Sequence, residues 1–201
     1  MMNIMFYIQD AEYIDKNKYM SEFSETRKNI KSCMRKFEHL QSYGFLNEKN
    51  YLNYLSGNKV LFCQGLKAFY DNTKIAADMD KKNHICSKRL RYVRYPLDKY
   101  LESQYYIYRI LVKLGTQIKS INRENILPTC TKDFICFDAE VCYLLDFASD
   151  QLKGAWKITN KNAILELINW FDSVFENAQD IADYFEPEKA ILENLKEYGI
   201  L

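Results

Sequence analysis

The basic residues of segment 88–94 are the strongest candidates for chemistry in this sequence. The run K-R-L-R-Y-V-R carries Lys88, Arg89, Arg91 and Arg94, with Tyr92 among them and no acid. On a β-strand, Arg89 and Arg91 would share one face and Arg94 would lie on the other. Guanidinium groups bind phosphate oxygens, and tyrosine rings stack on bases. This strand is therefore a candidate ligand-binding site for a phosphate group, a nucleotide or a nucleic acid.

Two acids downstream, Asp138 and Glu140, are candidates to complete such a site. They lie in D-A-E between F-I-C-F and V-C-Y-L-L-D. Carboxylates at this place could also act as an acid–base pair, but an Asp in a tight turn is already explained by its own hydrogen bonds. We favour the turn explanation and assign no catalytic residue.

The common active-site and cofactor signatures are missing from the chain. There is no phosphate-binding G-x-x-x-x-G-K-[ST] loop, no G-x-G-x-x-G, no G-x-S-x-G and no H-E-x-x-H. The six cysteines form no C-x-x-C pair, and His39 and His84 are the only histidines. A zinc site needs ligands at characteristic spacings. We therefore expect no metal and no cofactor, and thiols that are mostly buried.

Charge is distributed unevenly along a chain that is nearly neutral overall. Residues 161–201 hold nine acids and three lysines, a net charge of −6, which leaves +7 on residues 1–160 of a chain with net charge +1. The basic strand can pair with this acidic helical end inside the molecule, bind a partner protein, or bind phosphate. We favour pairing within the molecule or with a protein, because phosphate and nucleic-acid binders usually carry more positive charge.

The apolar pattern predicts an α/β fold, or α+β at its looser edge, with a mixed sheet of four to five strands. In the N-terminal part we expect an irregular arm or short strand over 1–16, a helix over 19–43 with Gly44 after it, a short helix capped by Asn47, and a helix over 59–79. In the middle of the chain we expect a strand from about Arg89 to Pro96, a helix over 97–114 and a parallel strand over 116–122. After a loop containing Pro128, we expect a hairpin of 134–137 with 141–147 and a strand over 154–158. The chain should end with a helix over 160–184 capped by Asn160 and a short last helix after Pro187.

These elements predict one domain over residues 1–201. Its parts would be a mainly helical section over 1–80, a sheet-containing core over 85–185 and a C-terminal helix over 186–201. A chain of this length can bury a sizeable core without disulfides. No run approaches the roughly 20 apolar residues of a membrane span, and the first residues lack a basic segment and a long apolar run, so we expect no secretory leader. We expect no membrane association and a cytoplasmic protein.

The same motifs resemble a bacterial domain family of unknown function that is often encoded beside small helix-turn-helix regulators in actinomycetes. The likeness lies in R-L-R-Y-V-R-Y-P-L-D-K-Y-L, G-T-Q-I-K, F-I-C-F-D-A-E-V-C-Y-L-L-D-F and K-G-A-W-K-I-T. It implies a protein partner, such as a helix-turn-helix regulator, and offers no catalytic residues. The order of elements also resembles a phospholipase-D-like topology, but the nucleophilic H-x-K motif of those enzymes is absent, because His39 and His84 are not followed by a lysine two residues later.

Two functions follow from these observations. The first is a non-enzymatic regulatory or protein-interaction module of a bacterial cytoplasmic protein. The alternative is a phosphate-recognising protein, either a nucleic-acid binder or a small nucleotide-processing enzyme, which would use strand 88–94. The two differ in whether the arginines line an open pocket or are covered by acidic side chains.

Overall fold

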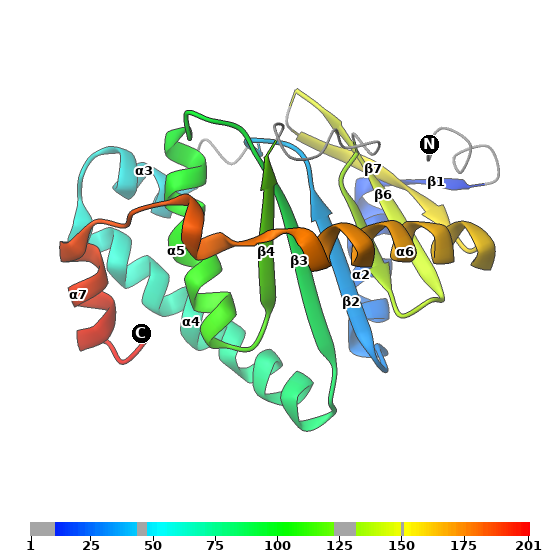
Figure 1. Cartoon of the computed structure of the whole chain (residues 1–201), viewed down its shortest axis with the longest axis horizontal. Coiled ribbons are helices and arrows are strands. Elements are labelled where there is room, and N and C mark those ends of the chain that lie inside the picture. The colour runs from blue at the N-terminus through cyan, green and yellow to red at the C-terminus, as the bar shows by residue number, and fades with distance from the viewer. Residues whose placement is uncertain (1–10, 44–47, 123–131, 150) are drawn as a thin grey trace.

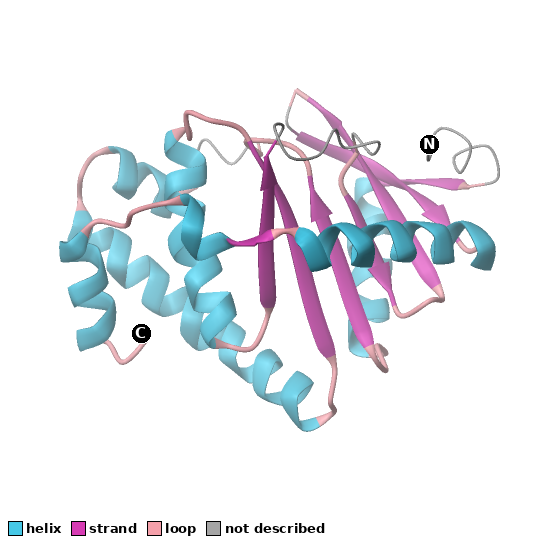
Figure 2. Cartoon of the chain, in the orientation of Figure 1, coloured by secondary structure: helices cyan, strands magenta, loops and turns pink. Residues whose placement is uncertain are grey.

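A computed structural model describes residues 11–43, 48–122, 132–149 and 151–201. Its centre is one mixed eight-stranded sheet (Figures 1 and 2). The strands are β1 (Glu12–Asp15), β2 (Cys33–Glu38), β3 (Cys86–Val93), β4 (Gln117–Asn122), β5 (Phe134–Phe137), β6 (Val141–Ala148), β7 (Gln151–Ile158) and β8 (Gln179–Asp180). They lie in the order β1-β7-β6-β5-β2-β3-β4-β8. The pairs β2–β3 and β3–β4 are parallel, and every other pair is antiparallel.

Helices cover both faces of this sheet and one end of it. They are α2 (Lys16–Lys28), α3 (Lys49–Leu55), α4 (Lys59–Lys82), α5 (Lys99–Lys113), α6 (Lys161–Asn177), the 3-10 helix η1 (Ile181–Tyr184) and α7 (Lys189–Glu197). Figure 1 shows α6 crossing one face of the strands and α2 behind them. The helices α3, α4, α5 and α7 gather at the β4 end. The connections between the parallel strands run through α3 and α4 and through α5, as parallel pairing requires.

Two apolar clusters hold the central strands between α2 and α6. On the α6 side, Phe37, Leu90 and Phe134 pack against Leu167 and Phe171 of the helix. On the α2 side, a second cluster contains Tyr19, Ile135, Phe137, Tyr143 and Leu145. Alternate residues of β5 thus enter different clusters, because successive side chains of a strand point to opposite faces.

Single capping or turn residues set the bounds of several elements, among them the predicted cap Asn160. The side chains of Asp98 and Asn160 accept backbone hydrogen bonds at the N-termini of α5 and α6. Gly115 ends the α5 connection with φ of +104°, a value that disfavours any residue with a Cβ. The predicted helix 97–114, its parallel strand, the hairpin around residues 138–140 and the last short helix are all confirmed.

The predicted helix over 19–43 is wrong in its second half. Helix α2 begins after the N-cap Asp15 and ends at Lys28, and residues 33–38 form β2 between β3 and β5. The spacing of Ile30, Met34 and Phe37 suits a helix, but in β2 Met34 packs toward the α2 cluster and Phe37 lies in the α6 cluster. A strand covered on both faces lacks the simple apolar–polar alternation that identifies half-buried strands.

The strand count of four to five was therefore too low. The sheet also includes β1, β2 and the two-residue β8, so strands from residues 12–38 join those of the predicted core. The predicted helix over 160–184 ends at Asn177, where β8 and η1 follow. The predictions for residues 1–10, Gly44, Asn47 and Pro128 fall outside the described residues. Within the described parts of the chain, no helix is long and apolar enough to span a membrane.

Candidate ligand-binding site

The two arginines in the middle of β3 belong to a charged cluster on the sheet face opposite α6. The centre of this cluster is Glu38, which is 3% exposed. Lys36 Nζ lies 2.7 Å from its Oε1, and Arg89 lies 3.6 Å from its Oε2. Tyr108 of α5 donates a hydrogen bond of 3.3 Å to the same carboxylate. Burial disfavours the charge of Glu38, but the surrounding cations outweigh burial and hold the pKa of this carboxyl well below its usual value.

Arg91 continues this cluster toward the end of β2 and is fully buried. Its guanidinium donates to the Tyr43 hydroxyl at 3.1 Å and to the Gln41 carbonyl at 3.0 Å, and it lies over the Tyr43 ring. Tyr43 in turn donates to Asp133, whose carboxylate also accepts from the backbone N–H of His39 at 2.8 Å. Arg91 therefore anchors the segment that follows β2, and its side chain is closed to solvent.

Lys88 and Tyr92 face α6 on the other side of the sheet. Lys88 Nζ lies 3.1 Å from Asp172 Oδ1, and Arg35 of β2 binds the same carboxylate with its Nε at 3.0 Å. Burial opposes ionisation of Asp172, but the hydrogen bonds from these two cations prevail and lower its pKa. Tyr92 is buried and stacks on the His39 ring at 4.9 Å. The contact between Lys88 and Asp172 is an instance of pairing with the acidic end inside the molecule, one of the alternatives that the charge distribution left open.

The remaining candidates lie apart from this cluster. Arg94 follows β3, is exposed, and donates its backbone N–H to Gln41 Oε1 at 2.9 Å. Asp138 accepts four hydrogen bonds from segment 31–33, three from backbone N–H groups and one from the Ser32 hydroxyl. Asp138 therefore lies beside the first residue of β2, whereas Glu38 is the last residue of this strand, where the register aligns it with Arg91. Glu140 is exposed and lies 4.0 Å from Lys161. The structure does not bring Asp138 or Glu140 to the arginines.

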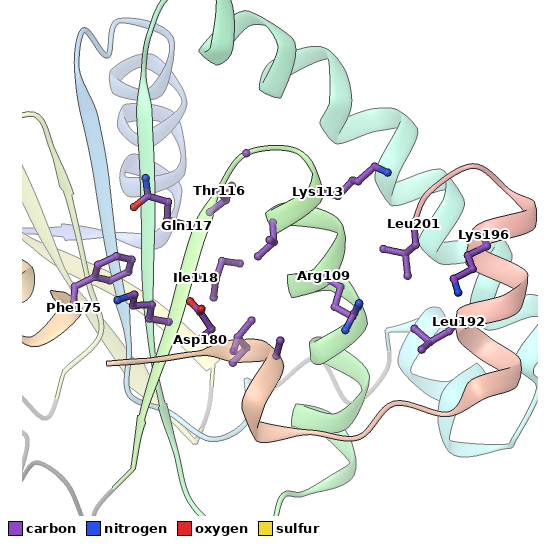
Figure 3. A pocket seen from close by; sticks show the side chains of 15 residues that line it. Arg109, Lys113, Thr116, Gln117, Ile118, Phe175, Asp180, Leu192, Lys196 and Leu201 are labelled. Atoms are coloured by element: carbon purple, nitrogen blue, oxygen red, sulfur yellow. The ribbon is translucent and has the colours of Figure 1, made fainter. Parts of the chain in front are cut away.

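A cavity of about 830 Å³ lies beyond β4, between that strand, α5, η1 and α7 (Figure 3). This volume is in the range of pockets that hold small molecules. Much of the lining is apolar, and these side chains are Val112, Ile118, Phe175, Ile181, Ala182, Leu192 and Leu201. Figure 3 shows Arg109 on α5 across from Leu192 and Lys196 on α7. A smaller cavity of about 280 Å³ adjoins it at Lys113, Gly115 and Thr116.

The charged lining of the large cavity is mostly basic. Arg109, Lys113, Lys119 and Lys196 line it together with a single acid, Asp180. Among the described residues, no carboxylate lies within 4 Å of any of these four cations, in contrast to Lys88 and Arg89. Arg109 donates to the Tyr105 hydroxyl at 3.0 Å, and Lys119 donates to the Glu176 carbonyl at 3.3 Å. Both contacts leave the positive charge of the side chain uncompensated.

This cavity could not be identified from the sequence. Its lining comes from six elements (α5, β4, α6, β8, η1 and α7), and residues 109–119 meet residues 175–201 only after folding. The available signals were the cluster of basic residues at the end of α5 and the apolar face of α7, where Ile191 and Leu195 are buried.

Within the described residues, no group of three or more His, Cys, Asp or Glu side chains is arranged to hold a metal ion.

Comparisons with known proteins identify a family and no activity. No curated protein matches the chain. Among solved structures, one described as the archaeal chromatin protein TrmBL2, with a novel mode of DNA binding, superimposes with a TM-score of 0.45 and 11% identity. The alignment covers 85% of this chain and 53% of that chain, and a likeness of this size carries no functional conclusion. The family model described as "Domain of unknown function (DUF6879)" matches residues 21–186, so the chain belongs to this family, as the resemblance to a family of unknown function led us to expect.

Proposed function

We propose that this domain is a non-enzymatic regulatory module that binds a small ligand in the cavity between α5 and α7. The ligand has an apolar body and an anionic group. The observation that carries the proposal is the set of four cations without carboxylate partners around a largely apolar lining. An apolar ligand body would remove this lining from water, and each square ångström of apolar area so buried contributes about 25 cal/mol.

The anionic group follows from the balance of charge at the cavity. Four basic side chains and one acidic side chain leave a surplus of three positive side-chain charges. A carboxylate or phosphate bound beside Arg109 and Lys196 would accept charge-assisted hydrogen bonds, which are roughly twice as strong as neutral ones. A cationic or purely polar ligand would meet repulsion or leave the apolar lining uncovered. The ligand class that fits is therefore an anionic amphiphile.

The alternative, phosphate recognition by strand 88–94, receives less support from the same geometry. Arg91 is closed to solvent, and Arg89 is held by Glu38. A phosphate at these arginines would have to replace contacts that already compensate their charge. Binding of a nucleotide or nucleic acid stays open at exposed Arg94, and it is an outcome of the experiment below.

The regulatory part of the proposal concerns α7, which contributes Leu192 and Lys196 to the cavity. This helix packs on α4 through an apolar cluster that contains Phe62 and Leu195. A ligand that contacts both α5 and α7 would stabilise the docked position of α7. We propose that a protein partner binds the domain when α7 is in this docked position. A helix-turn-helix regulator is the partner that the family resemblance implies.

The test is thermal unfolding of the full chain with dodecanoate, dodecyl phosphate, dodecanol, adenosine monophosphate or a short single-stranded DNA, each below its micelle-forming concentration where one exists. A ligand at a hundred times its dissociation constant stabilises the folded state by about 2.7 kcal/mol, which raises the midpoint measurably. We expect a shift with the two anionic amphiphiles and a much smaller one with dodecanol. Comparison of dodecanoate with dodecyl phosphate distinguishes the two head groups.

Variants assign any shift to the cavity. Arg109→Gln with Lys196→Gln removes two lining charges, and Ala182→Trp fills the cavity from an exposed position. The matched control is Lys189→Gln, which removes a lysine from the same helix at a position outside the lining. Both cavity variants should abolish the shift, and the control should keep it. A shift that survives in both cavity variants, or one produced only by DNA or adenosine monophosphate and lost in Arg94→Gln, would refute the proposal.

A further inference from the structure

Two cysteines face each other in the β5–β6 hairpin beneath α6. Cys136 and Cys142 are direct cross-strand partners in the antiparallel register, next to the turn at residues 138–140. The Sγ atoms of Cys136 and Cys142 lie 2.7 Å apart. Both side chains are fully buried in the α6 cluster. The sulfur atoms therefore need to move by less than 1 Å to reach the 2.03–2.05 Å of a disulfide bond.

We propose that Cys136 and Cys142 are a redox modification site, a dithiol that a peroxide converts into a cross-strand disulfide. This inference is independent of the ligand cavity, which neither cysteine lines. The oxidant is a small hydroperoxide, because a buried thiol is closed to bulky disulfide reagents in the folded state.

The chemistry balances in two steps. The sulfur of one cysteine attacks a peroxide oxygen, the O–O bond breaks, and the leaving hydroxide takes up the thiol proton as water, which leaves a sulfenic acid. The second sulfur attacks this sulfur, the S–O bond breaks, and the departing hydroxide takes the second thiol proton as another water. Two thiols and one hydrogen peroxide thus give one disulfide and two waters. The facing position of the second thiol is what directs the sulfenic acid to a disulfide.

The other described cysteines provide internal comparisons. Cys63 is buried on α4 in a different apolar cluster, so oxidation there would give no bridge to the hairpin. Cys33 and Cys86 are also cross-strand partners, in the parallel pair β2–β3, and their side chains interact. Cys86 is partly exposed, whereas the hairpin pair is enclosed. A disulfide in the hairpin would accordingly be slow to be reduced once formed.

Tryptic peptide mapping tests the proposal directly. Trypsin cleaves after Lys132 and Lys153, so Cys136 and Cys142 share one peptide, while each of the other four cysteines falls in a separate peptide. Reduced protein is treated with hydrogen peroxide, unfolded with N-ethylmaleimide and digested. The hairpin peptide should lose the mass of two hydrogen atoms and take up no maleimide. Dithiothreitol added before alkylation should restore two maleimide sites, and the Cys63 peptide should carry maleimide throughout.

A second experiment does not depend on access of the oxidant to the buried thiols. The reduced, unfolded chain is refolded in a mixture of oxidised and reduced glutathione, where both thiols are exposed until folding. The same internal bridge should appear, and Cys142→Ser should abolish it while Cys63→Ser leaves it unchanged. Two alkylated cysteines in the hairpin peptide after both treatments would overturn the proposal. A bridge that joins Cys136 to a different peptide would overturn it as well.

Discussion

Glu38 is the residue whose replacement tests most directly how the charged cluster contributes to stability. Its carboxylate contacts Lys36, Arg89 and Tyr108 on a sheet face from which water is largely excluded. Glu38→Ala would leave these cations, and the nearby buried Arg91, with no counter-charge from β2. We expect a large loss of stability, because a buried cation without a partner is more costly than the pair is favourable.

The magnitude follows from the burial of the pair. Breaking a buried ion pair by removal of one partner typically costs about 3–5 kcal/mol. A domain of this size unfolds with a free energy of about 5–15 kcal/mol, so Glu38→Ala can leave too little stability for folding. Glu38→Gln keeps the volume and one acceptor oxygen. It loses the charge-assisted part of the contacts, so we expect the free energy of unfolding to fall by about 2 kcal/mol.

The assay is urea unfolding at pH 7 of the wild type, Glu38→Gln and the control Glu140→Gln, whose side chain is 72% exposed. The control should change the free energy of unfolding by less than about 0.5 kcal/mol. The pKa of Glu38 is depressed in the folded state, so its stabilisation is complete above the unfolded pKa of about 4.3 and is lost as pH falls through the folded pKa. The difference in the free energy of unfolding between wild type and Glu38→Gln should therefore become smaller below about pH 4. A gap under 0.5 kcal/mol at pH 7, or one independent of pH, would refute the reasoning.

Three further substitutions probe single contacts, each by urea unfolding. Asp138→Ala removes the acceptor of four hydrogen bonds from segment 31–33 and should cost about 2–3 kcal/mol, with a smaller loss for Asp138→Asn. Gly65→Ala would place a Cβ 2.1 Å from Asn50 Oδ1, so it should destabilise by about 1–3 kcal/mol although alanine is the better helix former. Asp172→Asn removes the shared partner of two cations; because the pKa of Asp172 is lowered, its difference from wild type should disappear as pH falls through the folded pKa.

Local signals explain why the second half of the sheet could be predicted and β2 could not. Asp98 caps the start of α5, Gly115 follows its end, and the residues between β5 and β6 form a short turn, so these bounds depend on neighbouring residues alone. Segment 33–38 carries no such signal. Its assignment depends on β3 and β5, which pair with it from distant parts of the sequence. Gly65 shows how a local signal can indicate packing: glycine inside a helix is unfavourable unless a neighbour requires it, and here Asn50 approaches closely.

The charged residues show a similar division. A basic run without an acid marked Arg89 and Arg91 as unusual; Arg91 is fully buried, and Arg89 is paired with Glu38. Their partner Glu38 could not be identified, because the parallel register that aligns Glu38 with Arg91 joins residues far apart in sequence. The cavity could not be predicted from the sequence for the same reason. Its basic residues are separated along the chain and resemble ordinary solvated lysines until α7 is placed against α5.

The distribution of charge gives an argument for an external anion. The cavity lies where the basic part of the chain, represented by α5 and β4, meets the acidic part that begins with α6. If the charge asymmetry served internal pairing alone, acids of residues 161–201 would line this junction. Asp172 does so at Lys88, yet the cavity receives one acid, Asp180, and a further cation, Lys196, from the acidic part itself. Uncompensated like charges around one cavity oppose folding through mutual repulsion. A bound anion would relieve that repulsion, so its binding should stabilise the folded state, and this ligand-dependent stabilisation should weaken as salt screens the attraction between the anion and the cations.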